Sequence, residues 1–457
     1  MGNNLLPPTR ITSVTSARAV LWTGTTLTMA ATASVRFDRK ARLSRYLSKT
    51  MPYHNQRKLF PFFLKKNTGI LIPLSIAKIR VRHNIINMEY EKITEFENLL
   101  KAFNKAKLGN RNKESVAKFE NNLMESILYL QHLLKTDKYK MSGYYEFYVY
   151  EPKQRLVKSC HFKDKVVQQA LCEEIVKPKI SKILIKDNYA SQPGKGTHFG
   201  LDRLSGFMRS YYFSRRNKLI LKFKEGGKYP SKEALKWCTE GYVLKCDIRK
   251  FFYNIRHDVI KSMIARNFED ERVRKLIYHI IDSCPDPGIP IGNQLSQWLA
   301  VLYLNDMDHM IKSKLGIKYY GRYMDDFYLI HQDKSYLKYC LKVIKNYLKG
   351  VGLELNQKTQ IFPLRHGIDF LGFHTYLTDS GKVIRKLRRN SKNKMKKKIR
   401  KYKKMLDKGL ITEKEIKLSF KAWKAHASHG NCYNLIKNME EYYKEVFKKG
   451  ENKCLKD

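Results

Sequence analysis

Three aspartates stand at positions where the chain could support metal-dependent chemistry. Asp325 and Asp326 are adjacent in "GRYMDDFYLI", and Asp247 ends the segment "GYVLKCD". Adjacent carboxylates repel each other and are costly to bury. The flanking segments "IKYYGRY" and "FYLIHQ" predict a β-hairpin with residues 324–326 at its bend, where both carboxylates face a cleft. The alternative is an ordinary solvated turn, since Asp favours turns.

A bound divalent cation would remove the repulsion between these carboxylates. Mg²⁺ prefers oxygen ligands and keeps positions open for substrate phosphates. Two metal ions held by shared carboxylates suit in-line phosphoryl transfer. We therefore predict that Asp247, Asp325 and Asp326 hold two Mg²⁺ ions, for which Mn²⁺ can substitute.

The charge of the chain indicates a polyanionic partner. Lys and Arg total 90 and Asp and Glu total 42, so the net charge is 90 − 42 = +48 over 457 residues. Such an excess of one sign favours association with nucleic acid. A membrane is not expected as a partner, because no stretch reaches the roughly 18 uninterrupted apolar residues of a spanning helix.

The cysteines indicate a reducing compartment. All eight are scattered along the chain and form no CxxC pair. Neither a zinc site nor a disulfide framework is therefore predicted.

Composition separates residues 1–87 from the rest of the chain. This segment contains one acidic residue, Asp38, and is rich in Ser, Thr, Ala and Arg. We interpret it as a basic arm or as upstream sequence ahead of a start at Met88, in preference to an organellar transit peptide.

Periodicity predicts the elements after the arm. Apolar residues recur at helical spacing from about Glu91 to Asp137, and "YYEFYVYEPKQRLVKSCHF" predicts two strands joined by a turn. The basic segment Lys218–Lys236 is interpreted as an inserted loop. The charge run that begins at Arg385 contains an apolar stripe, formed by Met395, Ile399, Tyr402 and Leu406.

Five segments together resemble the motifs of reverse transcriptases. "KCDIRKFF", "GIPIGNQLSQWLAVLYLNDMD", "YMDD", "GLELNQKTQIF" and "IDFLGF" occur in the family order. "QRLVKSCHFKDKVVQQAL" and "NYASQPGKGTHFGLDRL" resemble the fingers blocks of bacterial members, so that the resemblance spans roughly Glu91 to Met439. "GNQLSQ", "YMDD" and "GKGTH" most resemble the enzymes of diversity-generating retroelements.

The resemblance implies a fold and a set of domains. The expected fold class is α/β (α+β), a right-hand polymerase with fingers, an antiparallel-sheet palm and a helical thumb. Residues 88–240 would form N-terminal helices and fingers, residues 241–376 the catalytic palm, and residues 377–457 the thumb and C-terminal tail.

The resemblance also implies roles for residues around the aspartates. The carbonyl of Ile248 would face a metal ion, and Lys358 would protonate the leaving pyrophosphate, with an ordinary exposed and solvated lysine as the alternative. Lys153 and Arg155 would grip the triphosphate, with an ordinary surface role as the alternative for these lysine and arginine side chains. Other residues would bind nucleotide or template: Gly292, Gln294, Ser296, Gln297, Tyr323 and Met324. The alternative for Gln294, Ser296 and Gln297 is helix capping. The primer grip would comprise Phe370, Leu371 and Gly372.

Phe252 is the expected sugar gate. In reverse transcriptases a bulky aromatic at this place excludes the ribose 2′-hydroxyl by steric clash. The alternative is that Phe252 belongs to the core, as Phe251 beside it is expected to do.

The expected function is RNA-directed DNA polymerase, a nucleotidyltransferase that adds deoxynucleotides to a primer 3′ end. Its partners would be an RNA template, a DNA or RNA primer, the hybrid duplex, deoxynucleoside triphosphates and a basic accessory protein, in a bacterial cytoplasm. The alternative is a phage-defence (antiviral) or other bacterial retroelement enzyme that copies a dedicated noncoding RNA.

Overall fold

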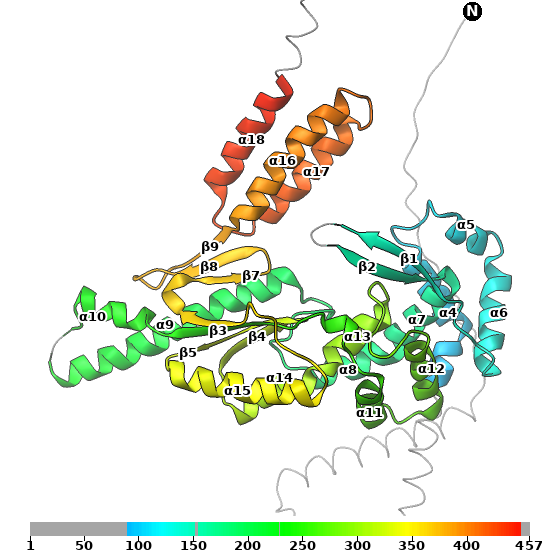
Figure 1. Ribbon diagram of the computed structural model, residues 1–457, viewed down its shortest axis with the longest axis horizontal. Helices are drawn as coiled ribbons and strands as arrows, with labels where there is room; N and C mark the ends of the chain where they lie inside the picture. Colours follow the sequence, from blue (N-terminus) through cyan, green and yellow to red (C-terminus); the bar gives the residue numbers. More distant parts are fainter. Residues whose placement is uncertain (1–88, 151–153, 228, 449–457) are drawn as a thin grey trace, which may run out of the picture. The chain divides into compact units, whose positions relative to one another are not determined.

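The computed structural model of the protein describes residues 89–150, 154–227 and 229–448 (Figure 1). All of these described residues belong to one compact unit. The predictions for residues 1–87 and for Lys153 fall outside the described residues.

A four-stranded antiparallel sheet forms the centre of the fold. Its strand order is β4-β5-β3-β6, and the strands are β3 (Tyr242–Asp247), β4 (Tyr319–Tyr323), β5 (Asp326–His331) and β6 (Gln360–Pro363). Aromatic and aliphatic residues fill β5, and Phe327, Tyr328, Leu329 and Ile330 are all buried. The amphipathic helix α15 (Lys334–Gly350) packs against β3, β5 and β6 (Figure 1). Helix α15 therefore covers one face of the sheet along these three strands.

Helices make up most of the described chain before and after β3. The N-terminal group comprises α4 (Phe96–Ala106), α5 (Glu114–Asn121), α6 (Leu123–Lys135), α7 (Phe162–Leu171) and α8 (Lys177–Ile183). After β3 come α11 (His257–Asn267), α12 (Glu271–Asp282), α13 (Gln294–Tyr303) and α14 (Asn305–His309). One continuous apolar core joins both groups to the central sheet. The helical pattern predicted from about Glu91 to Asp137 is confirmed.

The helix α9 (Thr197–Glu225) is longer than the sequence predicted. It extends through half of the segment Lys218–Lys236, which we had expected to be a loop, and a turn at Gly226–Gly227 leads to α10 (Lys232–Lys236). The prediction was wrong because the run of Lys, Leu and Phe before Gly226 has good helix propensity and contains no Gly or Pro. The helix packs against β4 and the later strands β8 and β9.

Two smaller sheets flank the central one. The hairpin of β1 (Tyr144–Val149) and β2 (Arg155–Cys160) matches the two predicted strands. A three-stranded sheet follows β6, with the order β7 (Ile368–Phe370), β8 (Phe373–Leu377) and β9 (Val383–Leu387). Its last strand leads directly into the C-terminal helices.

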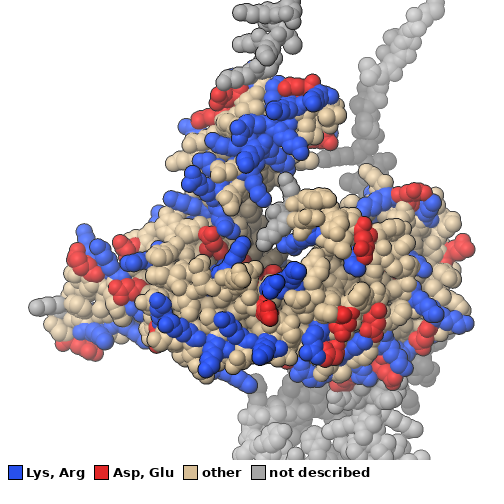
Figure 2. All heavy atoms as spheres, viewed as in Figure 1, with Lys and Arg blue, Asp and Glu red and all other residues tan. Residues whose placement is uncertain are grey.

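Three helices form a C-terminal bundle: α16 (Arg389–Leu406), α17 (Glu413–Ala427) and α18 (Tyr433–Lys448). Met395 and Ile399 are buried against Phe420 and Met439, which confirms this part of the predicted apolar stripe. Thr412 and Glu415 form a capping box at the start of α17. The other side of α16 carries lysines and arginines, and Figure 2 shows basic side chains gathered over this bundle.

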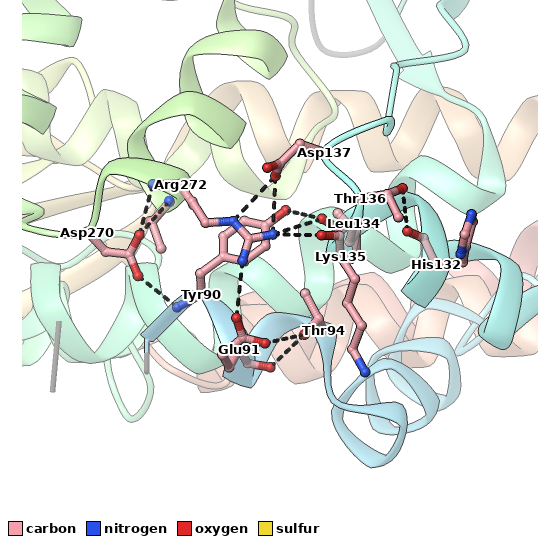
Figure 3. A network of polar contacts seen from close by, with 11 residues as sticks. Tyr90, Glu91, Thr94, His132, Leu134, Lys135, Thr136, Asp137, Asp270 and Arg272 are labelled. Carbon is pink, nitrogen blue, oxygen red and sulfur yellow. Dashed lines mark hydrogen bonds and ion pairs between the residues drawn. The ribbon is translucent and has the colours of Figure 1, made fainter. Parts of the chain in front are cut away.

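Arg272 joins the first described helix to α12, as Figure 3 shows. Its guanidinium pairs with Glu91 at 3.1 Å and Asp137 at 3.2 Å, and donates to the carbonyls of Leu134 and Lys135. Asp270 caps α12 and accepts a hydrogen bond from the backbone N–H of Tyr90. These contacts fix the beginning of the described chain on the core.

None of the described helices has both the length and the apolar character needed to cross a bilayer. The described cysteines are free thiols, as the sequence predicted. Cys454 falls outside the described residues.

Candidate active site

The three predicted carboxylates come together where two elements of the central sheet meet. Asp247 ends β3 and lies opposite Asp326, the first residue of β5, in the strand register. Asp325 is in the bend between β4 and β5, and its carbonyl accepts a hydrogen bond from Ile248 N–H at 3.2 Å. The register therefore gathers at one strand end aspartates that lie far apart in the sequence.

The environment of Asp325 disfavours its negative charge. Burial raises the pKa of the Asp325 carboxyl, and the neighbouring Asp247 carboxylate raises it further. The charges of Arg155 and Lys245 lower the pKa, but they do not reverse the shift. A site that raises the pKa of a carboxyl next to a second carboxylate is suited to binding a cation.

Lys245 is a member of the site that the sequence analysis did not identify. Its ammonium forms an ion pair with the Asp326 carboxylate and lies 5.2 Å from the centre of the Phe370 ring. Burial lowers the pKa of Lys245 to about 8, although Asp247 and Asp325 act in the opposite direction. The only sequence signal was its position two residues before Asp247, which places both side chains on one face of β3.

Lys245 also affects how the three carboxylates are arranged. Within residues 89–150, 154–227 and 229–448, no group of three or more His, Cys, Asp or Glu side chains has an arrangement that could hold a metal ion. Asp247 and Asp325 interact with each other electrostatically, whereas Asp326 has the Lys245 ammonium as its partner. The set of donors available to a cation without rearrangement is therefore a pair of carboxylates.

Asn356 is a second residue that the sequence analysis did not identify. Its side-chain amide donates to Asp247 Oδ2 at 3.0 Å, and its backbone N–H donates to the Asp247 carbonyl at 2.7 Å. These two bonds fix both the backbone and the carboxylate of Asp247. Asn356 lies in "GLELN", and its residue type alone gave no indication of this contact.

A buried ion pair supports the bend that carries Asp325. Arg322 is fully buried, and its Nε donates to Asp308 Oδ1 at 2.7 Å. Its guanidinium also donates to the carbonyl of Met324 at 3.0 Å and to that of Val301 at 3.2 Å. Burial lowers the pKa of Arg322, but the Asp308 carboxylate more than offsets this, so the net change is upward.

The bend also requires an unusual backbone conformation. Met324 has a φ of 53°, in the left-handed region that non-glycine residues rarely adopt. The bond from Arg322 to the Met324 carbonyl holds this conformation. Tyr323, the last residue of β4, and Met324 are both half-buried.

Two predicted nucleotide-binding residues, Arg155 and Phe252, belong to different elements, the strand β2 and a short 3₁₀ turn after β3. Arg155 is exposed at the start of β2 and is close enough to Asp325 for its charge to lower the pKa of that carboxyl. Phe252 lies in a short 3₁₀ turn (Phe251–Tyr253), is half-buried, and packs edge to face on Phe251 at 5.7 Å. Partial burial leaves part of the Phe252 ring available to a ligand.

The residues predicted from "GIPIGNQLSQ" divide into exposed and buried positions. Gly292 has a φ of 118°, and a Cβ atom there would lie 3.0 Å from a methyl of Val157 on β2. Gln294 begins α13, and the exposed Gln297 accepts a hydrogen bond from Ser191 at 3.4 Å. Ser296 is buried. Gln294 and Gln297 line one pocket of about 260 Å³.

The last two predicted features come before and after β6 in the sequence. Lys358 precedes β6 and is exposed, and its backbone N–H donates to Asn356 Oδ1 at 3.2 Å. In the predicted primer grip, Phe370 is buried and lies 5.1 Å from the Tyr328 ring. Leu371 and Gly372 form the turn between β7 and β8, with φ values of 48° and 87°.

Comparison with known structures finds telomerases. The chain is similar to apo telomerase from Candida tropicalis truncated from its C-terminal domain, with a TM-score of 0.38 and 15% identity over 57% of this chain and 59% of that one. It is also similar to telomerase from Candida albicans in complex with the TWJ fragment of telomeric RNA, with a TM-score of 0.39 and 12% identity over 61% and 55%. The chain thus spans between half and three-fifths of the length of these telomerases. No curated protein sequence matches significantly.

A protein-family model matches the middle of the chain. Residues 149–375 match the family described as reverse transcriptase (RNA-dependent DNA polymerase). The match contains Asp247, Asp325 and Asp326 and the whole central sheet. It bears out the predicted fold class and enzyme class, and residues 149–375 are thus similar to a reverse transcriptase domain.

Proposed function

We propose that the protein adds deoxynucleotides to the 3′ end of a primer on an RNA template, with divalent metal ions bound at Asp247, Asp325 and Asp326. The observation that carries this proposal is the meeting of the β3 end with the β4–β5 bend, where the Asp247 carboxylate raises the pKa of Asp325. Two carboxylates whose repulsion has no full compensation fit a hard cation such as Mg²⁺ or Mn²⁺.

Each residue of the site has a distinct task in this proposal. The metal ions, when bound, would activate the primer 3′-hydroxyl and neutralise charge on the pyrophosphate. Asn356 holds the Asp247 carboxylate in place. Lys245 holds Asp326 until that carboxylate is needed as a third ligand, with the carbonyl of Ile248 beside it.

Substrate binding is assigned to residues around the aspartates. Lys153 and Arg155 bind the triphosphate, and Lys358 donates a proton to the leaving pyrophosphate. The Phe252 ring excludes the 2′-hydroxyl of a ribonucleotide. The base and template contacts are assigned to Gly292, Gln294, Ser296, Gln297, Tyr323 and Met324, and the primer grip to Phe370, Leu371 and Gly372.

The elements around the sheet supply the rest of a right-hand polymerase. We assign residues 88–240 to N-terminal helices and fingers, residues 241–376 to the palm, and residues 377–457 to the thumb and tail. The basic surface of α16 in the thumb would bind the phosphates of the hybrid duplex. Residues 1–87 would be a basic arm outside the enzyme.

For the cellular role we propose a diversity-generating retroelement in a bacterial cytoplasm, with a basic accessory protein as partner. The support is the form of the motifs "GNQLSQ", "YMDD" and "GKGTH". The second candidate is a phage-defence or other retroelement enzyme that copies a dedicated noncoding RNA. A template and variable repeat pair beside the gene would support the first role, and its absence would favour the second.

Asp325→Asn tests the catalytic assignment. The variant should lose primer extension by about 10²–10³-fold or more, because it removes a charge that acts on the reacting groups. Its affinity for primed RNA should be unchanged, since affinity depends on the basic surface. Asp306→Asn, which removes an exposed carboxylate on α14, is the matched control and should extend normally.

A second measurement separates metal binding from turnover. In metal-free buffer, added Mg²⁺ should raise the Tm of the wild type and of Asp306→Asn, but not that of Asp325→Asn. Extension by Asp325→Asn at a rate near that of the wild type would show that these aspartates are not the catalytic centre.

A further inference from the structure

A pocket of about 460 Å³ lies between α9, the beginning of β9 and the loop from α17 to α18, and none of the three aspartates lines it. Its polar lining consists of Ser205, Arg209, Lys382, Arg385, His429 and Asn431. None of these residues belongs to the proposed catalytic, nucleotide-binding or primer-grip set. Most of them also lie beyond residue 375, where the family match ends.

The charge of this pocket is strongly positive. Arg209 and Lys382 are exposed, and neither forms an ion pair within the described part of the chain. Arg385 pairs with Asp202 at 2.8 Å, but the Asp202 side chain is 73% exposed and is therefore well solvated. Three basic side chains, of Arg209, Lys382 and Arg385, are thus opposed by one solvated carboxylate. This excess of positive charge favours an anionic ligand.

Arg385 is held in place before any ligand arrives. Its guanidinium donates to Ser205 Oγ at 2.9 Å and to the His429 carbonyl at 2.9 Å. Its backbone N–H donates to Asn431 Oδ1 at 2.9 Å, and the Asn431 N–H returns a bond to the Arg385 carbonyl. Because these bonds already fix the side chain, binding an anion costs little further conformational entropy.

The loop from α17 to α18 forms one wall of the pocket, and it approaches β9 closely because Gly430 has no side chain. A Cβ atom on Gly430 would lie 2.8 Å from the Arg385 carbonyl oxygen and 2.9 Å from the Phe373 ring. The loop therefore lies directly on β9, and His429 and Asn431 are carried to the pocket by this contact.

The lining favours a phosphate over a base or a whole nucleoside. Val383 supplies the one apolar side chain of the lining among the described residues. The His429 ring already stacks on His198, with the ring centres 3.5 Å apart, so one of its two faces is not free for a base. Recognition here would rest on charge and hydrogen bonds, which suits a sugar–phosphate backbone.

We propose that this pocket binds a backbone phosphate of an RNA strand outside the active site. The +48 charge of the chain makes nucleic acid the expected polyanion, and the pocket supplies a preorganised arginine flanked by two unpaired cations. An RNA held here would stay attached to the protein while its template segment is copied elsewhere. Binding at this pocket does not depend on catalysis.

The double variant Arg209→Glu/Lys382→Glu tests this proposal. Both side chains are exposed, so the fold should be kept, which thermal unfolding would check. Lys338→Glu/Lys342→Glu, with two exposed lysines of α15, is the matched control for the same change in net charge. Each protein is titrated with single-stranded oligouridine RNA at several salt concentrations, after its active site has been filled with a short primer–template duplex.

The Arg209/Lys382 variant should bind oligouridine about 10-fold more weakly than the control. The slope of log affinity against log salt should fall by about 1 or more, because each lost contact to a single strand removes about 0.7. Extension of the short primed template should be equal in both variants. The neutral variant Arg209→Gln/Lys382→Gln should show the same changes at smaller size.

Three outcomes would overturn the proposal. Equal RNA affinity and salt slope in the two double variants would show that the pocket does not bind RNA. Stabilisation of the wild type alone by millimolar inorganic phosphate, with RNA affinity unchanged, would make free phosphate the ligand. A loss of short-template extension in the Arg209/Lys382 variant would place the pocket on the path of the copied duplex.

Discussion

In the central sheet, Arg322 lies fully buried and Lys245 half-buried, each against a carboxylate, whereas the basic residues of α16 lie on the surface of the C-terminal bundle. The sequence of α16, "RNSKNKMKKKIRKYKKML", contains no acidic residue at all. The central sheet therefore contains few charged side chains, and each is held by a partner. The bundle contains many basic side chains, and few acidic residues lie near them to neutralise their charge.

This difference follows from the dielectric environment. A buried charge is tolerated only with a partner, and then both groups are held in one geometry. An exposed charge costs little and keeps its mobility, but salt screens its field. We therefore expect the sheet to determine the positions of reacting atoms and the bundle to determine affinity for a polyanion. The predictions below test this division.

The largest effect is expected at the buried pair of Arg322 and Asp308. Asp308→Ala leaves the guanidinium without its carboxylate at a fully buried position and should lower the free energy of unfolding by about 3–5 kcal/mol. Chemical denaturation of the purified proteins measures this change. Lys403→Ala breaks the exposed pair with Asp407 on α16 and should cost about 0.3–0.5 kcal/mol. A similar loss in the free energy of unfolding for the two variants would contradict the proposed difference between the sheet and the bundle.

The next prediction concerns the exposed charge. Lys394, Lys397 and Lys401 are exposed on one face of α16, opposite the buried Met395 and Ile399. Replacing the three lysines by Gln should reduce the slope of log affinity for a hybrid duplex against log salt by about 2–3.

The rate of extension by the bound complex should remain that of the wild type in this triple variant. A single-turnover experiment at saturating duplex measures this rate. At saturation all of the enzyme is bound, so a change in affinity does not affect the result. A large loss of rate at saturation would mean that the bundle also positions the reacting atoms.

Much of the fold could be predicted from the sequence because its signals are local. Alternation and β-branched or aromatic residues located β1, β2, β3 and the β4–β5 hairpin, and helical periodicity located the stripe that contains Met395 and Ile399. The length of α9 was predicted wrongly because the basic charge of "KLILKFK" was interpreted as a loop, although this run has good helix propensity and contains no Gly or Pro. The contacts of α9 with β4, β8 and β9 are long-range and leave no local pattern.

In the candidate site, too, residues with a local sequence signal could be predicted, whereas those that depend on long-range contacts could not. Asp247, Asp325 and Asp326 were identified because a strand end and a hairpin bend are local features. The pairing of Lys245 with Asp326 depends on the register between β3 and β5, and the bonds from Asn356 to Asp247 depend on the path of the chain before β6. Neither can be derived from spacing along the sequence.

A smaller effect is expected at Phe252, which bears no charge. Phe252→Ala should open space beside the sugar and raise the use of ribonucleotides relative to deoxynucleotides by about 10-fold. The measurement is the ratio of kcat/KM for a deoxynucleotide and its ribonucleotide partner on one RNA template. Because Phe252 is half-buried against Phe251, some loss of stability will accompany the change. An unchanged ratio would make Phe252 a core residue with no role as a gate.

An effect on stability much smaller than that of Asp308→Ala is expected at Arg272, whose charge is paired but only partly buried. The side chain is 34% exposed, and its carboxylate partners Glu91 and Asp137 are 51% and 68% exposed (Figure 3). Arg272→Lys keeps the charge but loses the forked contacts to the carbonyls, and should lower the free energy of unfolding by about 1 kcal/mol. Raising the salt concentration should reduce the difference between the two proteins, because solvent reaches these groups. A loss as large as that of Asp308→Ala would show that pairing, rather than burial, sets the strength of these interactions.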